Sequence, residues 1–154
     1  MHSALKSILK NIATLGFIGY IPFAPGTFGT LTGLILFMVF KPSLYSQLII
    51  IVTGTITGIC ASSAAETIFN EKDSNKIVID ELIGYCFAVF CIPYTFSFIF
   101  AAFILFRFFD ILKPLLISRL EKTLSGGLGI MTDDIVAGIY TNIILRTWIL
   151  FFRN

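Results

Sequence analysis

The chain has 154 residues, of which 56% are hydrophobic and only 13% charged, and its formal net charge is +2. This composition, with a mean hydropathy of +0.92, excludes an ordinary soluble domain and predicts one integral membrane domain over residues 1–154. The three cysteines lie within apolar runs and the only histidine is His2, so neither a disulfide framework nor cysteine or histidine catalysis is expected. We also expect no signal peptide and no nucleic-acid partner.

Residues 1–21 predict a helix that lies in the membrane interface, because leucines and isoleucines recur at helical spacing beside Lys6 and Lys10. A proline-rich stretch over 22–27 ends this helix. Five apolar segments follow, over residues 28–40, 44–69, 77–93, 94–112 and 135–152. A bilayer crossing needs about 20 residues, so the first segment is short. The sequence thus predicts an all-α, polytopic membrane helix bundle with four to five transmembrane segments.

If all five segments cross the membrane, most polar residues lie on the same side of the membrane as the N-terminus. Most basic residues near the segment ends fall on that side, namely Lys6, Lys10, Lys72, Lys76, Lys113, Arg119 and Lys122. Cytoplasmic loops carry the excess of lysine and arginine in membrane proteins. We therefore expect this side to face the cytoplasm.

Five carboxylates lie on the same side, at the predicted ends of apolar segments: Asp80, Glu81, Asp110, Asp133 and Asp134. Two carboxylates 4 Å apart repel by about 4 kcal/mol at an effective dielectric near 20, so the cluster requires protonation or a bound cation. Oxygen ligands without histidine or thiolate favour Mg²⁺ first, and Mn²⁺ or Ca²⁺ after it. Helix capping is the alternative for single residues, but it does not explain Asp110 at the C-terminal end of a helix.

Cationic and backbone groups near these acids are candidates for binding a phosphate. Arg107 and Asp110 share a helix face, and Lys113 follows where that helix ends. The two cations either form plain ion pairs or hold phosphate oxygens beside the metal. Thr27, at a predicted helix start, either adds a hydroxyl and backbone N–H groups to the site or only forms a tight turn.

Two further segments leave their roles open. The glycine-rich run over 126–129 is either a flexible hinge or a close backbone approach to a ligand. Glu66, Glu71 and Asp73 are interpreted as solvated charges at loop ends, with Glu66 the most plausible exception.

A metal, carboxylates and cations together suit hydrolysis or transfer of a phosphoryl group. A site at the cytoplasmic ends of transmembrane helices is accessible to a lipid headgroup whose acyl chains stay in the bilayer. We therefore expect a phospholipid substrate.

Four motifs resemble those of the phosphatidylglycerophosphatase A family: APGTFGT over 24–30, IVIDE over 77–81, FRFFDILKP over 106–114 and GLGIMTDD over 127–134. The resemblance covers residues 24–134 and beyond, most of the chain. It implies an Mg²⁺-dependent phosphatase of the bacterial inner membrane that hydrolyses phosphatidylglycerophosphate to phosphatidylglycerol, the step that also feeds cardiolipin synthesis.

By position, the resemblance assigns catalysis to the five acids and substrate binding to Thr27, Arg107 and Lys113. Metal binding is assigned to four of the acids, namely Asp80, Asp110, Asp133 and Asp134. Motif position alone does not divide metal ligation from general-base work among them. Leu116 replaces a proline frequent in the family and Thr30 a serine; neither change removes a charge.

Two other functions use similar residues. A phosphatidyltransferase also combines Mg²⁺ with membrane aspartates, but its DGxxAR-type motif is missing from this chain. An ion-coupled transporter would place acids near the middle of its spans and carry an internal repeat, and the sequence displays neither feature.

Overall fold

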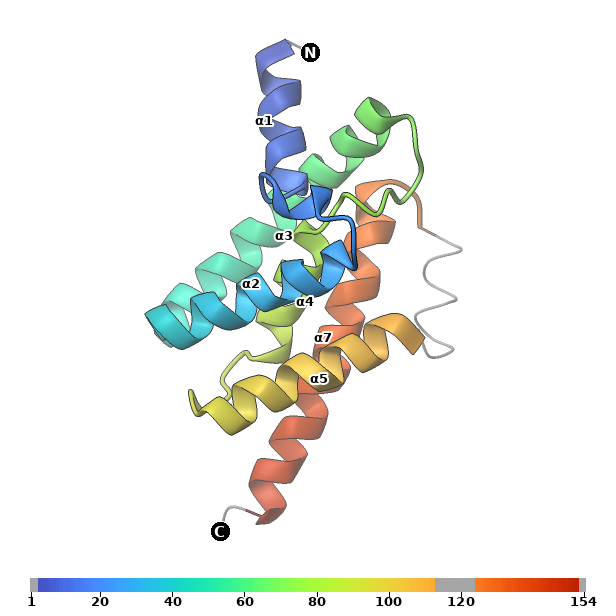
Figure 1. The fold of residues 1–154 in the computed structure, drawn as a ribbon. Coiled ribbons are helices and arrows are strands. Elements are labelled where there is room, and N and C mark those ends of the chain that lie inside the picture. The colour runs from blue at the N-terminus through green and yellow to red at the C-terminus, as the bar shows by residue number, and fades with distance from the viewer. Residues whose placement is uncertain (1–2, 113–123, 153–154) are drawn as a thin grey trace.

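A computed structural model describes residues 3–112 and 124–152, and every regular element in these ranges is helical (Figure 1). The elements are α1 (Ser3–Ala13), η1 (Ile18–Tyr20, a 3₁₀ helix), α2 (Pro25–Phe40), α3 (Leu44–Phe69), α4 (Ile79–Ala88), α5 (Phe96–Leu112) and α7 (Gly127–Phe152). The predicted all-α fold is thereby confirmed.

Two helices of 26 residues each, α3 and α7, are long and apolar enough to cross a membrane. The apolar helix α2 is shorter, with 16 residues. These helices support a membrane protein, but the count of four to five crossings is not confirmed. The interfacial position of the N-terminal helix also stays a prediction. That helix ends at Ala13 rather than at residue 21, because Leu15 and Gly16 adopt positive φ angles of 46° and 68°.

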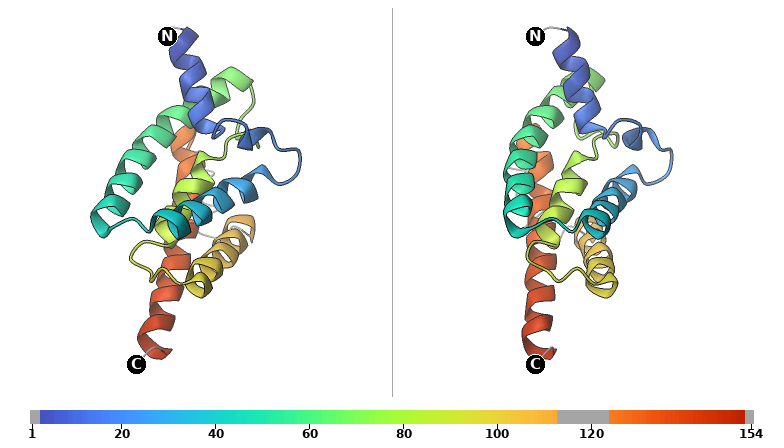
Figure 2. Two further views of the ribbon diagram at one scale, coloured as in Figure 1. Left: turned by 60° about the vertical axis from the view of Figure 1, so that its left-hand side comes forward. Right: turned by 90° about the vertical axis from the view of Figure 1, so that its left-hand side faces the viewer.

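The third predicted crossing, over residues 77–93, contains only the ten-residue helix α4. At 1.5 Å per residue this helix is about 15 Å long, half the thickness of the hydrocarbon core of a bilayer. It packs against α2, α3, α5 and α7, and Figure 2 shows it in the middle of the bundle. The observed helix is therefore shorter than the expected one, and it is central to the fold.

Side chains from α7 satisfy the carbonyl groups that are left where α4 ends. Asn142 donates hydrogen bonds to the carbonyl oxygens of Ala88 (3.0 Å) and Phe90 (2.8 Å). Arg146 donates to the same oxygen of Phe90 (3.1 Å). The last carbonyls of a helix have no partner within it, so donors from another element are needed. The short α4 thus depends on α7 at this end.

The last helix, α7, starts at Gly127 instead of near residue 135, because its first turn packs closely against α3. The backbone N–H of Gly127 donates to Ser63 Oγ (2.9 Å), and a Cβ added at Gly127 would clash with the carbonyl oxygen of Ile59. The glycine-rich run therefore allows a close contact between two helices. As a consequence, Asp133 and Asp134 lie in the second turn of α7 and not at its start.

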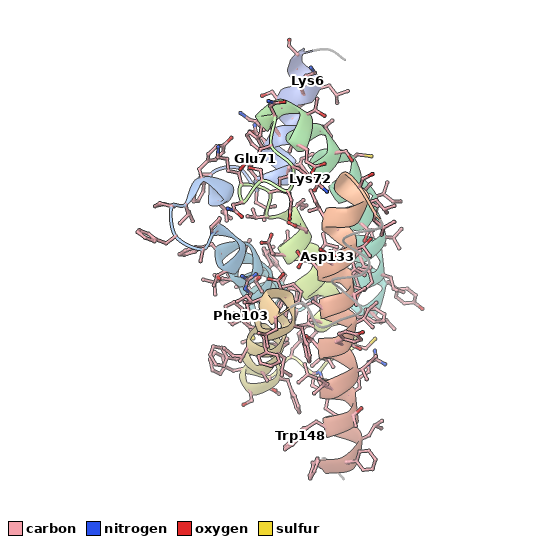
Figure 3. The ribbon with its side chains drawn as sticks, turned by 90° about the vertical axis from the view of Figure 1, so that its right-hand side faces the viewer. Lys6, Glu71, Lys72, Phe103, Asp133 and Trp148 are labelled. Atoms are coloured by element: carbon pink, nitrogen blue, oxygen red, sulfur yellow. The ribbon has the colours of Figure 1, made fainter. Side chains whose placement is uncertain are left out.

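The starts of α2, α4 and α7 and the end of α5 meet at one end of the bundle (Figure 1). In Figure 3, Lys6, Glu71 and Lys72 lie toward this end and Trp148 lies at the opposite end. This arrangement agrees with the expectation that the polar segments share one side. We call it the acid end.

Candidate active site

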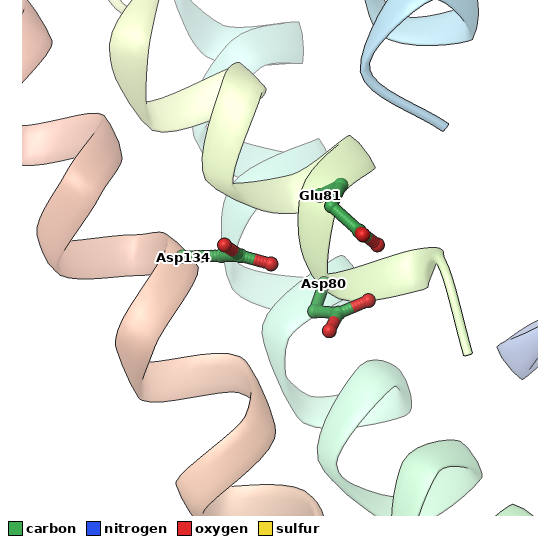
Figure 4. A group of neighbouring side chains, drawn as sticks. All are labelled: Asp80, Glu81 and Asp134. Atoms are coloured by element: carbon green, nitrogen blue, oxygen red, sulfur yellow. The ribbon is translucent and has the colours of Figure 1, made fainter. Parts of the chain in front are cut away.

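Three carboxylates converge where α4 crosses α7 (Figure 4). Asp80 and Glu81 lie in the first turn of α4, and Asp134 lies in the second turn of α7. One oxygen of each lies within 4.8 Å of the other two. Gly84, one turn after Asp80, permits this approach, since a Cβ there would lie 2.7 Å from the carbonyl oxygen of Asp134. We call these three residues the carboxylate trio.

Asp80 and Asp134 are shielded from solvent, Glu81 is half-buried, and the trio is incompletely hydrogen-bonded. Only 8% of Asp80 and 4% of Asp134 is exposed. Asp80 Oδ1 and Glu81 Oε2 are buried and have no hydrogen-bond partner. The start of a helix stabilises a nearby acid by about 0.3–1 kcal/mol, whereas an unpaired buried carboxylate costs several times more. The helix dipole alone therefore does not account for this arrangement.

Burial also disfavours the charged form of the two acids in α4, which lie outside the candidate membrane spans α3 and α7. It raises the pKa of Asp80 well above its usual range, and the nearby charge of Glu81 adds to this effect. Burial likewise raises the pKa of Glu81, although a hydrogen bond with Asp80 and the charge of Arg107 oppose the rise. A bound cation would reverse these shifts, because it stabilises the charged carboxylates.

Arg107 and Asp110 form an ion pair one turn apart on α5. Their side chains are 16% and 15% exposed, so the pair is largely withdrawn from water. Arg107 Nε is buried and has no hydrogen-bond partner. The i, i+3 pair expected from the sequence is therefore present, and it places a guanidinium beside the carboxylates.

All five predicted acids line one polar cavity of about 140 Å³, which we call the acid cavity. Its remaining lining residues are Asp73, Ser74, Asn75, Ile77 and Ile130. An adjoining cavity of about 220 Å³ shares Asp73, Ile130 and Asp133 with it. Asp133 therefore lies where the two cavities meet.

The start of α2 reaches the same acids from another side. A Cβ added at Gly26 would clash with Glu81 Oε1 and lie 3.3 Å from Arg107 Nη1. In the first turn of α2, Pro25 has no N–H, and the N–H groups of Thr27 and Phe28 donate to the carbonyl oxygen of Ala24 (2.9 and 3.4 Å), which leaves the N–H of Gly26 for a ligand. Thr27 is half-buried in the same turn. A helix start, a guanidinium and the acids are thus brought together.

The structure groups the predicted metal ligands differently from the sequence analysis. Glu81 belongs to the trio although it was not assigned to the metal. Asp110 and Asp133 lie outside the trio and line the same cavity. Their roles as ligands or catalytic residues stay predictions. Lys113 lies outside the described residues.

The loop after α3 was not predicted to belong to the site, because its charges are typical of a solvated turn. Asp73 lines the acid cavity, and its backbone N–H donates to Glu66 Oε1 (2.9 Å). Ser74 Oγ donates to Glu71 Oε2 (2.6 Å), which also orders this loop. No local signal marks these residues as part of a site, since the loop reaches the acids only through the fold.

Comparison with known proteins shows the family of the chain. The family model of phosphatidylglycerophosphatase A matches residues 11–149. The chain belongs to this family. A phosphatidylglycerophosphatase A of Haemophilus influenzae is 37% identical over 149 residues, which cover 91% of this chain and 90% of the relative. The Escherichia coli protein of the same name is 33% identical over 144 residues, covering 87% and 83%.

A third relative has a different name. A Bacteroides thetaiotaomicron protein named "Putative phosphatidylinositol-3-phosphatase" is 34% identical over 156 residues, covering 94% of this chain and 97% of its own length. No solved structure matches the chain significantly. As a member of the phosphatidylglycerophosphatase A family, the protein is a phosphatase. The comparisons confirm the resemblance carried by the four motifs and give no support to a transporter or a phosphatidyltransferase.

Proposed function

We propose that the protein is an Mg²⁺-dependent phosphatase that converts phosphatidylglycerophosphate to phosphatidylglycerol and phosphate, in phosphatidylglycerol and cardiolipin biosynthesis. We place it in a bacterial inner membrane as a multi-pass protein, with its active site on the cytoplasmic face. The observation that carries the proposal is the buried carboxylate trio in a chain of this family. The names of two relatives support phosphatidylglycerophosphate as the substrate. The third relative is named for an inositol lipid, so the choice between the two lipid headgroups has to be tested.

The residues of the acid cavity fit Mg²⁺. The trio of Asp80, Glu81 and Asp134 supplies only oxygen donors, and two of these oxygens lack any other partner. Hard cations such as Mg²⁺ prefer such ligands. When bound, the ion would neutralise charge on the phosphate and on the leaving oxygen. Asp133 lines the same cavity and can complete the ligand set.

The phosphate is held by cationic and backbone groups next to Glu81. Arg107 presents a guanidinium next to Glu81, and the first turn of α2 presents the N–H of Gly26 and the Thr27 hydroxyl. An arginine binds two phosphate oxygens through its paired N–H groups, and a helix N-terminus binds them through backbone N–H groups. Lys113 is proposed to join them.

We assign the proton transfer to Asp110. It lines the acid cavity without belonging to the trio, and its ion pair with Arg107 fixes its position. Water attacks the phosphorus atom and gives a proton to Asp110, while the bond from phosphorus to the glycerol oxygen breaks. The departing oxygen then takes up that proton, which leaves a neutral alcohol and inorganic phosphate.

The proposal is tested by measuring phosphate release from the purified protein in lipid micelles. We expect release from phosphatidylglycerophosphate with Mg²⁺ and none in excess chelator. Phosphatidic acid and phosphatidylinositol 3-phosphate serve as competing phosphomonoesters, and we expect slower release from both. Undiminished activity in chelator would refute the metal, and faster release from the inositol lipid would refute the substrate.

The orientation is tested by cysteine labelling in cells after the three native cysteines are replaced. Ser125 is exposed near the start of α7, and Tyr45 is 79% exposed at the start of α3, at the opposite end of the bundle. We expect Ser125→Cys to react only with a reagent that enters the cytoplasm, and Tyr45→Cys to react from outside. The reverse pattern would overturn the orientation.

A further inference from the structure

A larger cavity, of about 480 Å³, lies beside the acid cavity at the start of α2. It is lined by Gly19, Tyr20, Ile21, Pro22, Ala24, Pro25, Asn75 and Lys76. Asn75 lines both this cavity and the acid cavity, so the two are neighbours that meet at one side chain. We call the larger one the Lys76 cavity. Nothing in the proposed chemistry uses it.

The segment that forms one wall of the Lys76 cavity is rich in exposed aromatic side chains. Phe17 is 77% exposed, Tyr20 48% and Phe23 81%. Figure 2 shows this segment, between α1 and α2, projecting away from the helix bundle. Aromatic residues gather at membrane–water interfaces, and exposed apolar surface of this kind marks a contact with lipid or a partner. This wall is therefore suited to the apolar end of a phospholipid.

Among the described residues that line this cavity, Lys76 is the one cation, and the proposed chemistry does not use it. The ammonium group of Lys76 lies 5.1 Å from the ring centroid of Phe69. Within residues 3–112 and 124–152 it forms no ion pair, in contrast to Arg107, which pairs with Asp110, a lining residue of the acid cavity. A contact with an aromatic ring leaves the N–H groups of a lysine free to bind an anion.

We propose that the Lys76 cavity binds the phosphodiester of the lipid, with Lys76 contacting its charge, while the terminal phosphate reaches the acid cavity past Asn75. The inference rests on the proposed function, because phosphatidylglycerophosphate carries two phosphate groups separated by a glycerol. The molecule offers two neighbouring cavities to match them: Lys76 lines one, and Arg107 pairs with Asp110 of the other. The acyl chains leave the cavity along the aromatic wall.

The test uses the two products of the reaction as competitive inhibitors of the full-length protein in micelles. Phosphatidylglycerol retains the phosphodiester but lacks the terminal phosphate, and inorganic phosphate represents the terminal phosphate alone. We expect Lys76→Gln to raise the inhibition constant of phosphatidylglycerol about tenfold, since one contact to a charged group changes affinity by about that factor. The inhibition constant of inorganic phosphate changes less than about twofold. Lys6→Gln is the matched control, because Lys6 is an exposed lysine on α1 and its loss changes the net charge equally.

Two results would overturn the inference. One is that Lys76→Gln weakens both inhibitors equally, or neither. The other is that phosphatidylglycerol fails to inhibit the wild-type protein at all. Turnover of phosphatidylglycerophosphate by the wild type is a separate outcome, and its absence would refute the proposed function instead. Circular dichroism and gel filtration of Lys76→Gln show whether the variant is folded, which is expected because Lys76 is exposed.

Discussion

The C-terminal end of α4 meets donors that satisfy its carbonyl groups, whereas its N-terminal end carries carboxylate oxygens that lack partners. At the C-terminal end, Asn142 and Arg146 hydrogen-bond backbone oxygens. Nearby, buried Gln47 donates to the Tyr94 hydroxyl (2.6 Å) and accepts from the backbone N–H of Cys91 (3.0 Å). At the N-terminal end, the carboxylate trio gathers like charges in a buried place.

The difference separates polar groups that serve folding from polar groups that serve a ligand. Neutral amides and hydroxyls with complete hydrogen bonds stabilise a buried helix end at little cost. Buried carboxylates without partners destabilise the fold unless they bind a cation or become protonated. Substitutions at the two ends should therefore affect stability and activity in opposite ways.

The largest effect is expected for Asp80→Asn at the acid end. Phosphate release should fall by about a thousandfold, because loss of a metal ligand removes several kcal/mol of transition-state stabilisation. The free energy of unfolding without Mg²⁺ should stay the same or rise, since a neutral amide replaces a buried carboxylate. Release assays and urea unfolding in micelles measure the two quantities. If Asp80→Asn were strongly destabilised but fully active, the N-terminal end of α4 would serve folding and not a ligand.

Asp110→Asn should lower the turnover number by about a hundredfold or more, which is the usual contribution of a general base. Stabilisation by Mg²⁺ should persist, because Asp110 lies outside the trio. Thermal unfolding with and without Mg²⁺ is the measurement that distinguishes the two roles. If the Mg²⁺ effect disappears together with turnover, Asp110 is a ligand, as the sequence analysis assigned it.

Mg²⁺ itself should stabilise the wild-type protein. At one hundred times its dissociation constant a ligand adds about 2.7 kcal/mol to the free energy of unfolding. The matched variant is Asp134→Asn, which removes one member of the trio and should lose most of this gain. Isothermal calorimetry or a thermal shift series reports it. Equal stabilisation of both proteins would show that the trio is not the Mg²⁺ site.

The smallest effect on activity is expected at the other end of α4. Asn142→Ala removes two hydrogen bonds and should cost about 1–3 kcal/mol of stability, because the carbonyl of Ala88 is left without this donor. Turnover of the folded variant should stay within about twofold of wild type. Thr147→Ala, at an exposed position on the same helix, is the control. A large loss of turnover at unchanged stability would remove the distinction between the two ends.

The bounds of α3 could be predicted from the sequence because local residues mark both of its ends. Ser43 caps the start by accepting the backbone N–H of Ser46 (3.3 Å), and Asn70 ends the helix in the left-handed conformation. The length of α4 could not be predicted in this way. Its end is completed by Asn142, which lies 54 residues further along the chain than Ala88.

The sequence by itself determined the helical, apolar character of the chain, its family, and the five acids that line the site, because hydropathy and motifs are read along the chain. Only the tertiary structure decided which acids form the trio. Neighbouring residues on a helix point about 100° apart, so the rotation of α7 selects Asp134 over Asp133. Packing sets that rotation: Gly84 and Gly138 let α4 and α7 touch where larger residues would clash. Such contacts between distant segments leave no local pattern in the sequence.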